Sequence, residues 1–430
     1  MMPPPDKNTS VFLDGALPHV GDLSHAETRR GGEFFSRKER KDHKAGGPTS
    51  VSATIDRSTW KRVRLGDYAT LFAGGTPSRA VSDYYGGTIP WCSISDISNA
   101  GKFLTRTEES LTSLGLEKSS AKLIPADAIL FAMYASIGEC SLATTPLATS
   151  QAILGIYNLK GFDREYLYYY LCSRKDAFIN QGQTGTQSNL SKEILSNLQL
   201  PKPEIEEQCS IAVSLSTIDT NISALQSLIA KYEAIKKATV NLLLEPKSDW
   251  RQISLGDIGD VLMCKRILKN QTTETGDVPF YKIGTFGRTP DSFISRALFK
   301  DFKARFSYPK KGDVLLSAAG TIGRTVVFNG EDAYFQDSNI VWIDNDERAV
   351  TNRFLNVLYG QMNWQTENGG TVSRLYNANI RNTKINIPSL SEQKRIVAIL
   401  DSIDGTINGL KSQLAKAQDI KQGMMSYFFG

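Results

Sequence analysis

The strongest constraint in this sequence is that it repeats itself. Six short matches occur in the same order in both halves of the chain, and the spacing between partners changes only slightly from the first match to the last. They pair residues 60–67 with 250–257, 89–91 with 278–280, 128–130 with 313–315, 136–138 with 321–323, 207–208 with 392–393, and 218–219 with 403–404. Six matches in one order indicate a duplication, so the fold must be built from two copies of one module.

The first part of each copy has the pattern of an α+β globular domain. Short apolar or β-branched runs alternate with Gly, Pro and Ser, which predicts strands of a curved sheet with helices at residues 164–173 and 352–362. The expected strands are 128–133, 152–157, 314–317, 325–328 and 340–343. Proline-bearing segments at 200–203 and 387–388 close the two domains, which we place at 59–203 and 247–388.

The second part of each copy is predicted to be a long helix, within 204–246 and 389–430. Apolar residues step 4, 3, 4, 3 along both segments, which is the heptad seam of a left-handed coiled coil. A globular amphipathic helix has a similar stripe, but several clean heptads in both copies favour the coiled coil. The duplication favours antiparallel pairing. The expected pairing residues are Ile211, Leu215, Ile218, Ile222, Leu225, Ile229, Ile396, Leu400, Ile403, Ile407, Leu410 and Leu414.

Composition argues against most enzyme classes without excluding them. The only histidines are His19, His25 and His43, which leaves the folded body without the usual general base and the commonest metal ligand. A carboxylate or lysine site stays open. The net charge of +5 is compatible with a polyanionic partner, although an ordinary solvated surface would give the same value.

Cysteine usage and hydropathy predict a soluble cytoplasmic protein. The five cysteines are scattered, without a C-x-x-C pair, and suit a reducing compartment. Neither a secretory signal nor an apolar run of roughly 18 to 20 residues is present. Residues 1–58 are polar and rich in Gly and Pro, and we expect them to be a disordered extension.

Two glycine-rich segments resemble catalytic motifs but lack essential parts. Residues 71–76 would need a following helix to form a nucleotide-binding turn, and Pro77 and Ser78 follow instead. Residues 319–325 lack the first glycine and the lysine of a P-loop, so we expect a turn between strands. No Asn-Pro-Pro-Tyr-like segment is found, which an adenine methyltransferase would need.

The loops of the two domains instead carry the residue types that bind DNA. Arg can fork onto guanine and Asn or Gln onto adenine, while hydroxyl and backbone N–H groups suit phosphates. A single loop of this kind is equally compatible with a plain polar turn. Two DNA-binding domains joined by a rigid spacer, however, suit a long polymer, because binding of one domain raises the effective concentration of the other. The candidates are Thr76, Ser78, Arg79, Thr184, Thr186, Gln187 and Asn189 in the first domain, and Lys265, Arg266, Lys269, Thr371, Ser373 and Arg374 in the second.

Four features of the two modules are informative together: the opening Trp-x-x-x-x-Leu-Gly-Asp, residues 74–78 with 84–91, residues 312–315 with 320–323, and Pro-x-x-x-Glu-Gln at both helix starts. With these motifs the chain resembles, over residues 60–430, the specificity subunit of type I restriction–modification enzymes. The second domain departs from this pattern because Val261 to Lys265 stand near the place of the Gly-Gly-Thr-Pro-Ser stretch.

The resemblance implies two target-recognition domains that read a split, asymmetric DNA sequence, with the paired helices as a ruler. It implies that this chain is not itself catalytic and has no metal or cofactor of its own. The expected partners are double-stranded DNA, two modification subunits that bind S-adenosylmethionine and methylate adenine, and restriction subunits that use ATP and magnesium to translocate and cut. The charge predicts weak DNA binding by the chain alone.

Two other interpretations remain open at this level. One is a self-contained nuclease or methyltransferase with duplicated domains, and the other is a coiled-coil scaffold without a role on DNA. Methyl transfer by the purified chain would support the first, and an absence of sequence preference in the assembled complex would support the second.

Overall fold

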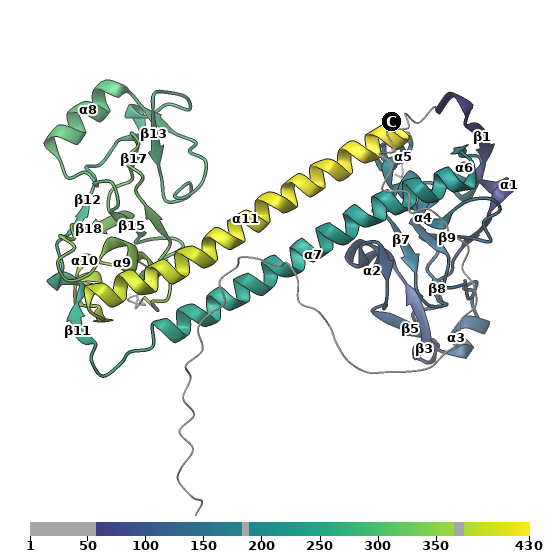
Figure 1. The fold of residues 1–430 in the computed structure, drawn as a ribbon, viewed down its shortest axis with the longest axis horizontal. Helices are drawn as coiled ribbons and strands as arrows, with labels where there is room; N and C mark the ends of the chain where they lie inside the picture. Colours follow the sequence, from purple (N-terminus) through teal and green to yellow (C-terminus); the bar gives the residue numbers. More distant parts are fainter. Residues whose placement is uncertain (1–56, 183–188, 365–373) are drawn as a thin grey trace, which may run out of the picture. The chain divides into compact units, whose positions relative to one another are not determined.

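The computed structural model describes residues 57–182, 189–364 and 374–430, which form mixed helix-and-strand domains alternating with two long helices (Figure 1). We call the part from β1 to β10 the first domain and the part from β11 to β19 the second domain. Residues 57 and 58 of the expected disordered extension belong to a 3-10 turn, η1 (Arg57–Thr59), and the rest of the extension lies outside the described residues.

The first domain contains three sheets. A five-stranded sheet has the order β2-β9-β6-β7-β4, a three-stranded sheet has the order β5-β3-β8, and β1 pairs with β10. The strands are β1 (Lys61–Arg64), β2 (Thr70–Ala73), β3 (Tyr85–Cys92), β4 (Phe103–Leu104), β5 (Glu109–Leu111), β6 (Ile129–Ala132), β7 (Cys140–Ala143), β8 (Ala148–Thr149), β9 (Ile153–Tyr157) and β10 (Gln199–Lys202). The helices are α1 (Leu65–Tyr68), η2 (Ser82–Tyr84), α2 (Ile94–Ala100), α3 (Ser113–Glu117), α4 (Arg164–Ser173), α5 (Lys175–Gly182) and α6 (Lys192–Ser196).

The second domain repeats this plan with fewer strands in its larger sheet. The order β12-β18-β15-β16 replaces the five-stranded sheet, β14-β13-β17 replaces the three-stranded sheet, and β11 pairs with β19. The strands are β11 (Arg251–Ser254), β12 (Val261–Met263), β13 (Val278–Tyr281), β14 (Phe293–Ile294), β15 (Val314–Ser317), β16 (Thr325–Val327), β17 (Tyr334–Phe335), β18 (Ile340–Ile343) and β19 (Lys384–Ile387). The helices are η3 (Leu255–Asp257), η4 (Lys269–Gln271), α8 (Arg296–Arg305), α9 (Asn352–Tyr359) and α10 (Asn377–Asn382).

The turn between β15 and β16 shows why residues 319–325 are not a phosphate-binding loop. They connect two antiparallel neighbours, with Gly320 and Gly323 at positive φ, and the Ser317 Oγ accepts a hydrogen bond from the Arg324 backbone at 2.9 Å. The expected strand-connecting turn is confirmed.

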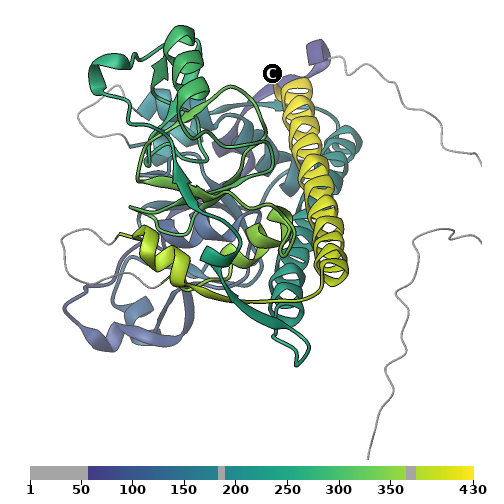
Figure 2. The same ribbon diagram turned by 90° about the vertical axis from the view of Figure 1, so that its left-hand side faces the viewer.

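The two long helices, α7 (Ile205–Leu243) and α11 (Leu390–Phe429), lie side by side and antiparallel (Figures 1 and 2). Asp219 of α7 pairs with Lys421 of α11 at 2.6 Å, and Lys236 of α7 pairs with Asp404 of α11 at 2.6 Å. Asp404 is the repeat partner of Asp219, and the same alignment of the two copies places Lys421 opposite Lys236. The two ion pairs are therefore one contact made twice, as a pseudo-two-fold axis between the helices requires.

All twelve heptad residues are buried or half-buried, but they do not share one environment. Ile211 and Leu215 belong to the core of the first domain, and Ile396 and Leu400 belong to the core of the second. Each helix thus uses its first heptad to attach to its own domain.

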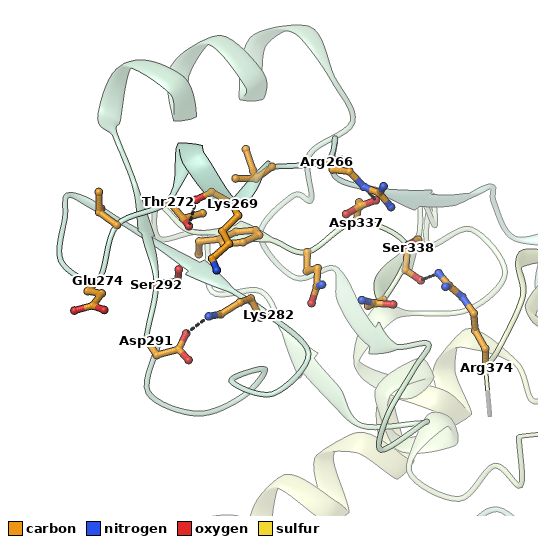
Figure 3. A pocket seen from close by; sticks show the side chains of 15 residues that line it. Arg266, Lys269, Thr272, Glu274, Lys282, Asp291, Ser292, Asp337, Ser338 and Arg374 are labelled. Atoms are coloured by element: carbon orange, nitrogen blue, oxygen red, sulfur yellow. Dashed lines mark hydrogen bonds and ion pairs between the residues drawn. The ribbon is translucent and has the colours of Figure 1, made fainter. Parts of the chain in front are cut away.

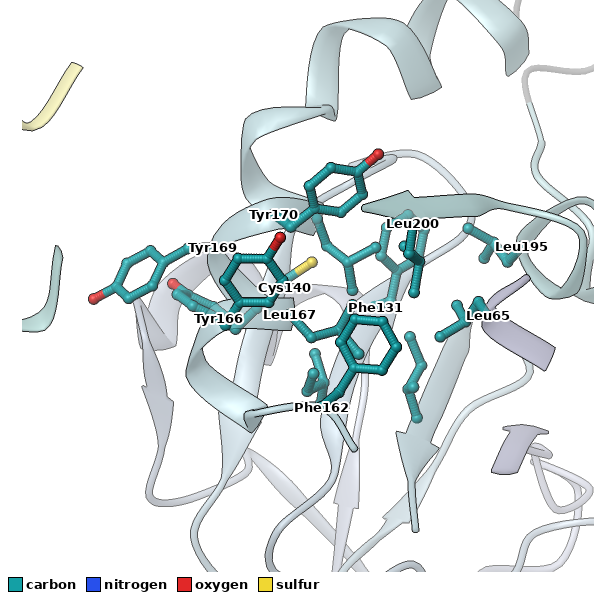
Figure 4. Packing of buried hydrophobic residues seen from close by; sticks show 14 of the residues in the cluster. Leu65, Phe131, Cys140, Phe162, Tyr166, Leu167, Tyr169, Tyr170, Leu195 and Leu200 are labelled. Carbon is teal, nitrogen blue, oxygen red and sulfur yellow. The ribbon is translucent and has the colours of Figure 1, made fainter. Parts of the chain in front are cut away.

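The first-domain core is centred on α4, whose tyrosines come from both faces of the helix. Tyr166, Leu167, Tyr169 and Tyr170 belong with Phe131 to one buried cluster, and Figure 4 shows the side chains of Tyr169 and Tyr170 leaving the helix in different directions. The far end of α11 completes this core, because Phe429 makes ring contacts with Tyr166 and Tyr170 at centroid distances of 5.6 and 5.7 Å. Val240 near the end of α7 joins the second-domain core in the same way. Each domain is therefore closed by both helices.

A polar network joins the first domain to both helices. The Lys102 ammonium is largely buried and donates to Glu165 and Tyr169 of α4 and to Ser216 of α7 at 2.8 to 3.0 Å. The Tyr169 hydroxyl donates in turn to Asp219, the partner of Lys421. In the described part of the chain, no helix combines the length and apolar character of a membrane-spanning segment.

Candidate nucleic-acid interface

The three-stranded sheets of the two domains are equivalent strand by strand. In the first, Trp91 of β3 lies opposite Glu109 of β5 and beside Ala148 of β8. In the second, Phe280 of β13 lies beside Tyr334 of β17, and its backbone N–H donates to Ser292 at 2.8 Å. Phe280 therefore takes the place of Trp91, and Ser292 the place of Glu109.

The loop that follows β2 corresponds to the loop that follows β12. Ala73 pairs with Leu154, and Met263 pairs with Val341, so the two strands end at the same point of their sheets. Counting onward from these ends, Thr76 corresponds to Arg266 and Arg79 corresponds to Lys269.

Contacts support this correspondence. Thr76 hydrogen-bonds to Gln151, and Arg266 pairs with Asp337 at 2.9 Å, on the segments that follow β8 and β17. A third correspondence joins Asn189, which bridges to Tyr134, and Arg374, which bridges to Ala319. Candidate residues from separate loops thus occupy equivalent positions in the two domains.

In the first domain these positions form a compact group, the Arg79 cluster: Arg79, Tyr85, Trp91 and Glu109. The two terminal nitrogens of Arg79 donate to the two oxygens of Glu109 at 2.7 and 2.8 Å. The guanidinium carbon lies 4.6 Å from the Tyr85 ring centre and 5.1 Å from that of Trp91. The hydrogen bonds to Glu109 raise the pKa of Arg79, which stays charged.

The rings of the Arg79 cluster are anchored to the loop that carries Arg79. The Tyr85 hydroxyl donates to the Pro77 carbonyl at 2.6 Å, and the Trp91 indole donates to the Gly75 carbonyl at 3.0 Å. A Cβ added to Gly74 would lie 2.0 Å from the Thr149 carbonyl oxygen, so this loop approaches the sheet more closely than a side chain allows. Residues 74–78 form no helix, as the following Pro77 and Ser78 predict, and Gly74 and Gly75 allow this loop to pack against the neighbouring backbone.

In the second domain the equivalent positions line an open pocket of about 1140 Å³, the second-domain pocket (Figure 3). Its walls include the positions that match the Arg79 cluster, Lys269, Phe280 and Ser292, together with Arg266 and Arg374. Figure 3 shows the amino groups of Lys269 and Lys282 directed toward the same space.

The charges of the second-domain pocket are partly neutralised. Arg266 pairs with Asp337, Lys282 pairs with Asp291 at 2.8 Å, and Arg374 donates to the Ser338 carbonyl at 2.8 Å. Cations, acids, amides and hydroxyls all line this one concave surface, and these are residue types that can contact base edges and phosphates.

Some predicted residues lie elsewhere or cannot be placed. Lys265 lies over the Phe306 ring at 5.3 Å and does not line the second-domain pocket, and Ser78 is exposed without joining the Arg79 cluster. Thr184, Thr186, Gln187, Thr371 and Ser373 lie outside the described residues.

Sequence reasoning missed the partners of the placed residues. Tyr85, Trp91 and Glu109 were not among the candidates, nor were Lys282 and Asp337. The available signals were the family resemblance over residues 84–91 and the repeat match of residues 89–91 with 278–280, which mark the strand without revealing what packs on it.

The glutamines of the two Glu-Gln motifs are also placed by the structure. Gln208 is fully buried and joins the start of α7 to the loop before α4, with hydrogen bonds to Pro203, Gly161 and Asp163. Gln393 makes the equivalent bonds to Pro388, Ala349 and Thr351. These residues fix each long helix to its domain. Among the described residues, no group of three or more His, Cys, Asp or Glu side chains could hold a metal ion.

The family model for the type I restriction modification DNA specificity domain matches residues 57–234 and, a second time, residues 247–417. The chain belongs to this family. The two matches coincide with the two copies of the module, so each copy is one specificity domain of the family together with its helix.

Individual relatives agree with this assignment. A Haemophilus influenzae protein named as a putative type I restriction enzyme specificity subunit is 44% identical over 278 residues, which are 62% of this chain and 71% of that protein. The MjaVIII specificity subunit of Methanocaldococcus jannaschii is 23% identical over 85% of this chain and 91% of its own length.

Solved structures share the fold. The crystal structure of a type I restriction–modification S subunit from M. genitalium has a TM-score of 0.56 at 16% identity, covering 89% of this chain and 98% of that one. A chain from a study of complex assembly in the type I system has a TM-score of 0.53 at 18% identity, covering 86% and 97%.

Proposed function

We propose that this chain is the non-catalytic specificity subunit of a type I restriction–modification complex and that it reads a bipartite, asymmetric DNA target. The observation that carries the proposal is that equivalent positions of the two domains hold different residues. The first domain has Arg79 paired with Glu109, whereas the second has Lys269 and Ser292 at these positions, in a pocket lined by residues of both charges. Unlike surfaces at equivalent positions suit unlike half-sites. Residues 59–203 and 247–388 are then the target-recognition domains.

The proposed DNA contacts of the second domain come from the residues that line its pocket. Arg266, Lys269 and Arg374 share that pocket, which favours a common ligand. Because this pocket contains both cations and acids, its net positive charge is small, and we expect weak DNA binding by the chain alone, with partner subunits supplying much of the positive surface.

We further propose that α7 and α11 form an antiparallel coiled coil that sets the spacing of the half-sites. With 39 residues, α7 is about 58 Å long at 1.5 Å per residue. Half-sites one helical turn apart are separated by about 34–36 Å, which a spacer of this length spans. The repeated ion pairs at Asp219 and Asp404 fix the register of the two helices.

Two modification subunits are the proposed protein partners, together with restriction subunits. The helices carry exposed apolar residues at equivalent places: Ile235 and Leu242 on α7 correspond to Ile420 and Tyr427 on α11. Two equivalent apolar patches suit two copies of one partner. S-adenosylmethionine, ATP and magnesium would be bound by those partners, and the methylation of adenine and the cleavage of DNA would be their reactions.

The proposal is tested by assembling this chain with the modification subunit of its own system and mapping the methylated adenines on genomic DNA. We expect one split motif with unlike halves, and no methyl transfer by this chain alone with S-adenosylmethionine. Methylation without a sequence preference, or methylation by the isolated chain, would contradict the proposal.

Two variants test the separate roles of the helices. Insertion of one heptad into both α7 and α11 should lengthen the spacer of the motif and leave both half-sites unchanged. Ile235→Glu with Ile420→Glu should weaken assembly with the modification subunit, whereas Gln226→Glu with Gln413→Glu, at exposed polar positions of the same helices, should not.

A further inference from the structure

We propose that Arg79 reads a guanine in the half-site of the first domain and that Glu109 is a positioning residue for this contact. The inference rests on the proposed function and names one base for one residue.

The hydrogen bonds of Arg79 leave one edge of its guanidinium available. Glu109 accepts from both terminal nitrogens, which occupies the end of the group. Arginine has five N–H donors in a fixed plane, so the Nε–H and an outer N–H remain as a second fork. In the described part of the chain this second fork has no protein acceptor within hydrogen-bonding distance, and the Arg79 side chain is 57% exposed. Two parallel N–H donors match the O6 and N7 acceptors of guanine in the major groove.

The surroundings of Arg79 hold that fork in one orientation. Tyr85 and Trp91 lie nearly perpendicular to each other, at 80°, and the guanidinium lies within about 5 Å of both ring centres. Both rings are hydrogen-bonded to carbonyls of the Arg79 loop. Glu109 is held on the same sheet, because β5 is paired with β3 at this position. The reading edge is therefore aligned before DNA binds, which lowers the entropy lost on binding.

The charge balance favours a base over a phosphate as the ligand. Phosphate contacts depend on net positive charge, and the Glu109 carboxylate cancels most of the charge of Arg79. A neutralised but directed donor pair retains the geometry that a planar base edge needs. At the equivalent position of the second domain, the exposed Lys269 has a single ammonium group and lacks two parallel N–H donors. Ser292 replaces Glu109 in that domain. The contact is thus expected in one half-site only.

The experiment maps methylated adenines for the assembled complex containing wild-type chain, Arg79→Ala, Arg79→Lys or Glu109→Gln. Two control variants are Arg64→Ala, an exposed arginine on β1, and Lys269→Ala in the second-domain pocket. Competition between targets that differ at single positions then gives the discrimination factor at each base pair, and melting temperatures confirm that each variant is folded.

We expect Arg79→Ala to relax a single G·C position in one half-site by about 5- to 150-fold, which is the range for one bidentate contact. Arg79→Lys should relax the same position, because lysine keeps the charge and loses the fork. Glu109→Gln should weaken discrimination there without introducing another preferred base. Arg64→Ala should change no position, and Lys269→Ala should affect the other half-site alone.

Three results would overturn the inference. The first is that the relaxed position is an A·T pair. The second is that Arg79→Ala weakens binding to all sites equally and lowers the salt dependence, as the loss of a phosphate contact would. The third is that Glu109→Gln leaves discrimination at this position unchanged. A wild-type complex that methylates no split motif would instead refute the proposed function, so the two failures are distinguishable.

Discussion

Replacing Gln208 by Met should destabilise the first domain far more than its place on a helix suggests. Gln208 has no exposed surface, and its amide accepts from the Asp163 backbone at 2.9 Å and donates to the carbonyls of Pro203 at 2.9 Å and Gly161 at 3.2 Å. Methionine has a similar volume and leaves no large cavity. The substitution therefore isolates the three hydrogen bonds that attach α7 to its domain.

The magnitude follows from the groups left without partners. A buried donor or acceptor that loses its partner costs about 1–3 kcal/mol. Three such groups at the lower end of this range give about 3 kcal/mol. For a domain of this size, 1 kcal/mol lowers Tm by about 2–4 °C, so we expect a loss of about 6–12 °C. Gln393→Met should have the same effect on the second domain, since Gln393 makes the same three bonds.

The assay is thermal unfolding by calorimetry, combined with amide hydrogen exchange at Asp163 and Thr351. Gln226→Met and Gln413→Met place the same substitution at exposed positions of the same two helices and should leave Tm nearly unchanged. Gln208→Met should release the Asp163 amide and not the Thr351 amide, and Gln393→Met should do the reverse. If Gln208→Met lowered Tm no more than the controls, the assignment of Gln208 as the attachment of α7 would be wrong.

Three further substitutions test individual contacts. Gly74→Ala should destabilise the first domain by about 1–3 kcal/mol in urea unfolding, because the added Cβ would lie 2.0 Å from the Thr149 carbonyl oxygen. The control Gly284→Ala should be tolerated, because no atom lies within 4 Å of its Cβ. Gly409→Ala lies in open space on α11 and should stabilise the chain by up to about 1 kcal/mol; a lower Tm would show that the exposed face of α11 is packed. Hydrogen bonds from Arg395 and Lys247 lower the pKa of Glu392 to about 2, so its stabilising effect is present above its unfolded pKa of about 4.3 and is lost as the pH falls toward 2. The Tm difference between wild type and Glu392→Gln should therefore narrow as the pH falls from 5 to 2, and a difference that stays constant over this range would contradict the ion pairs.

The fold was predictable because its signals are local or repeated. Proline and acidic residues mark the helix starts, and apolar heptads run through much of each helix, so the helix expected within 204–246 is observed as Ile205–Leu243. The helices expected at 164–173 and 352–362 are α4 and α9, the second ending earlier than expected, at Tyr359. Such signals depend on neighbours within a few turns.

The candidate site was only partly predictable because it depends on strand register. Arg79 and Glu109 are 30 positions apart and meet only because β3 pairs with β5 across an irregularity between Tyr85 and Ile89. The spacing between equivalent positions of the two domains also changes by one between Arg79 with Lys269 and Trp91 with Phe280. A one-residue change in register moves every side chain to the other face of a strand, so the sequence alone could not align the two surfaces.

The position of Phe429 has a consequence for the order in which the chain acquires its structure during synthesis. The ribosome makes the first domain early, yet Tyr166 and Tyr170 obtain their ring contacts from Phe429 only after the second domain and α11 have been made. Until then the apolar surface that Phe429 covers is exposed on the nascent first domain, and exposed apolar surface is what chaperones protect in general. A truncated product that lacks α11 would keep this surface exposed. Its recognition by chaperones would therefore distinguish truncated chains from chains in which α11 is complete.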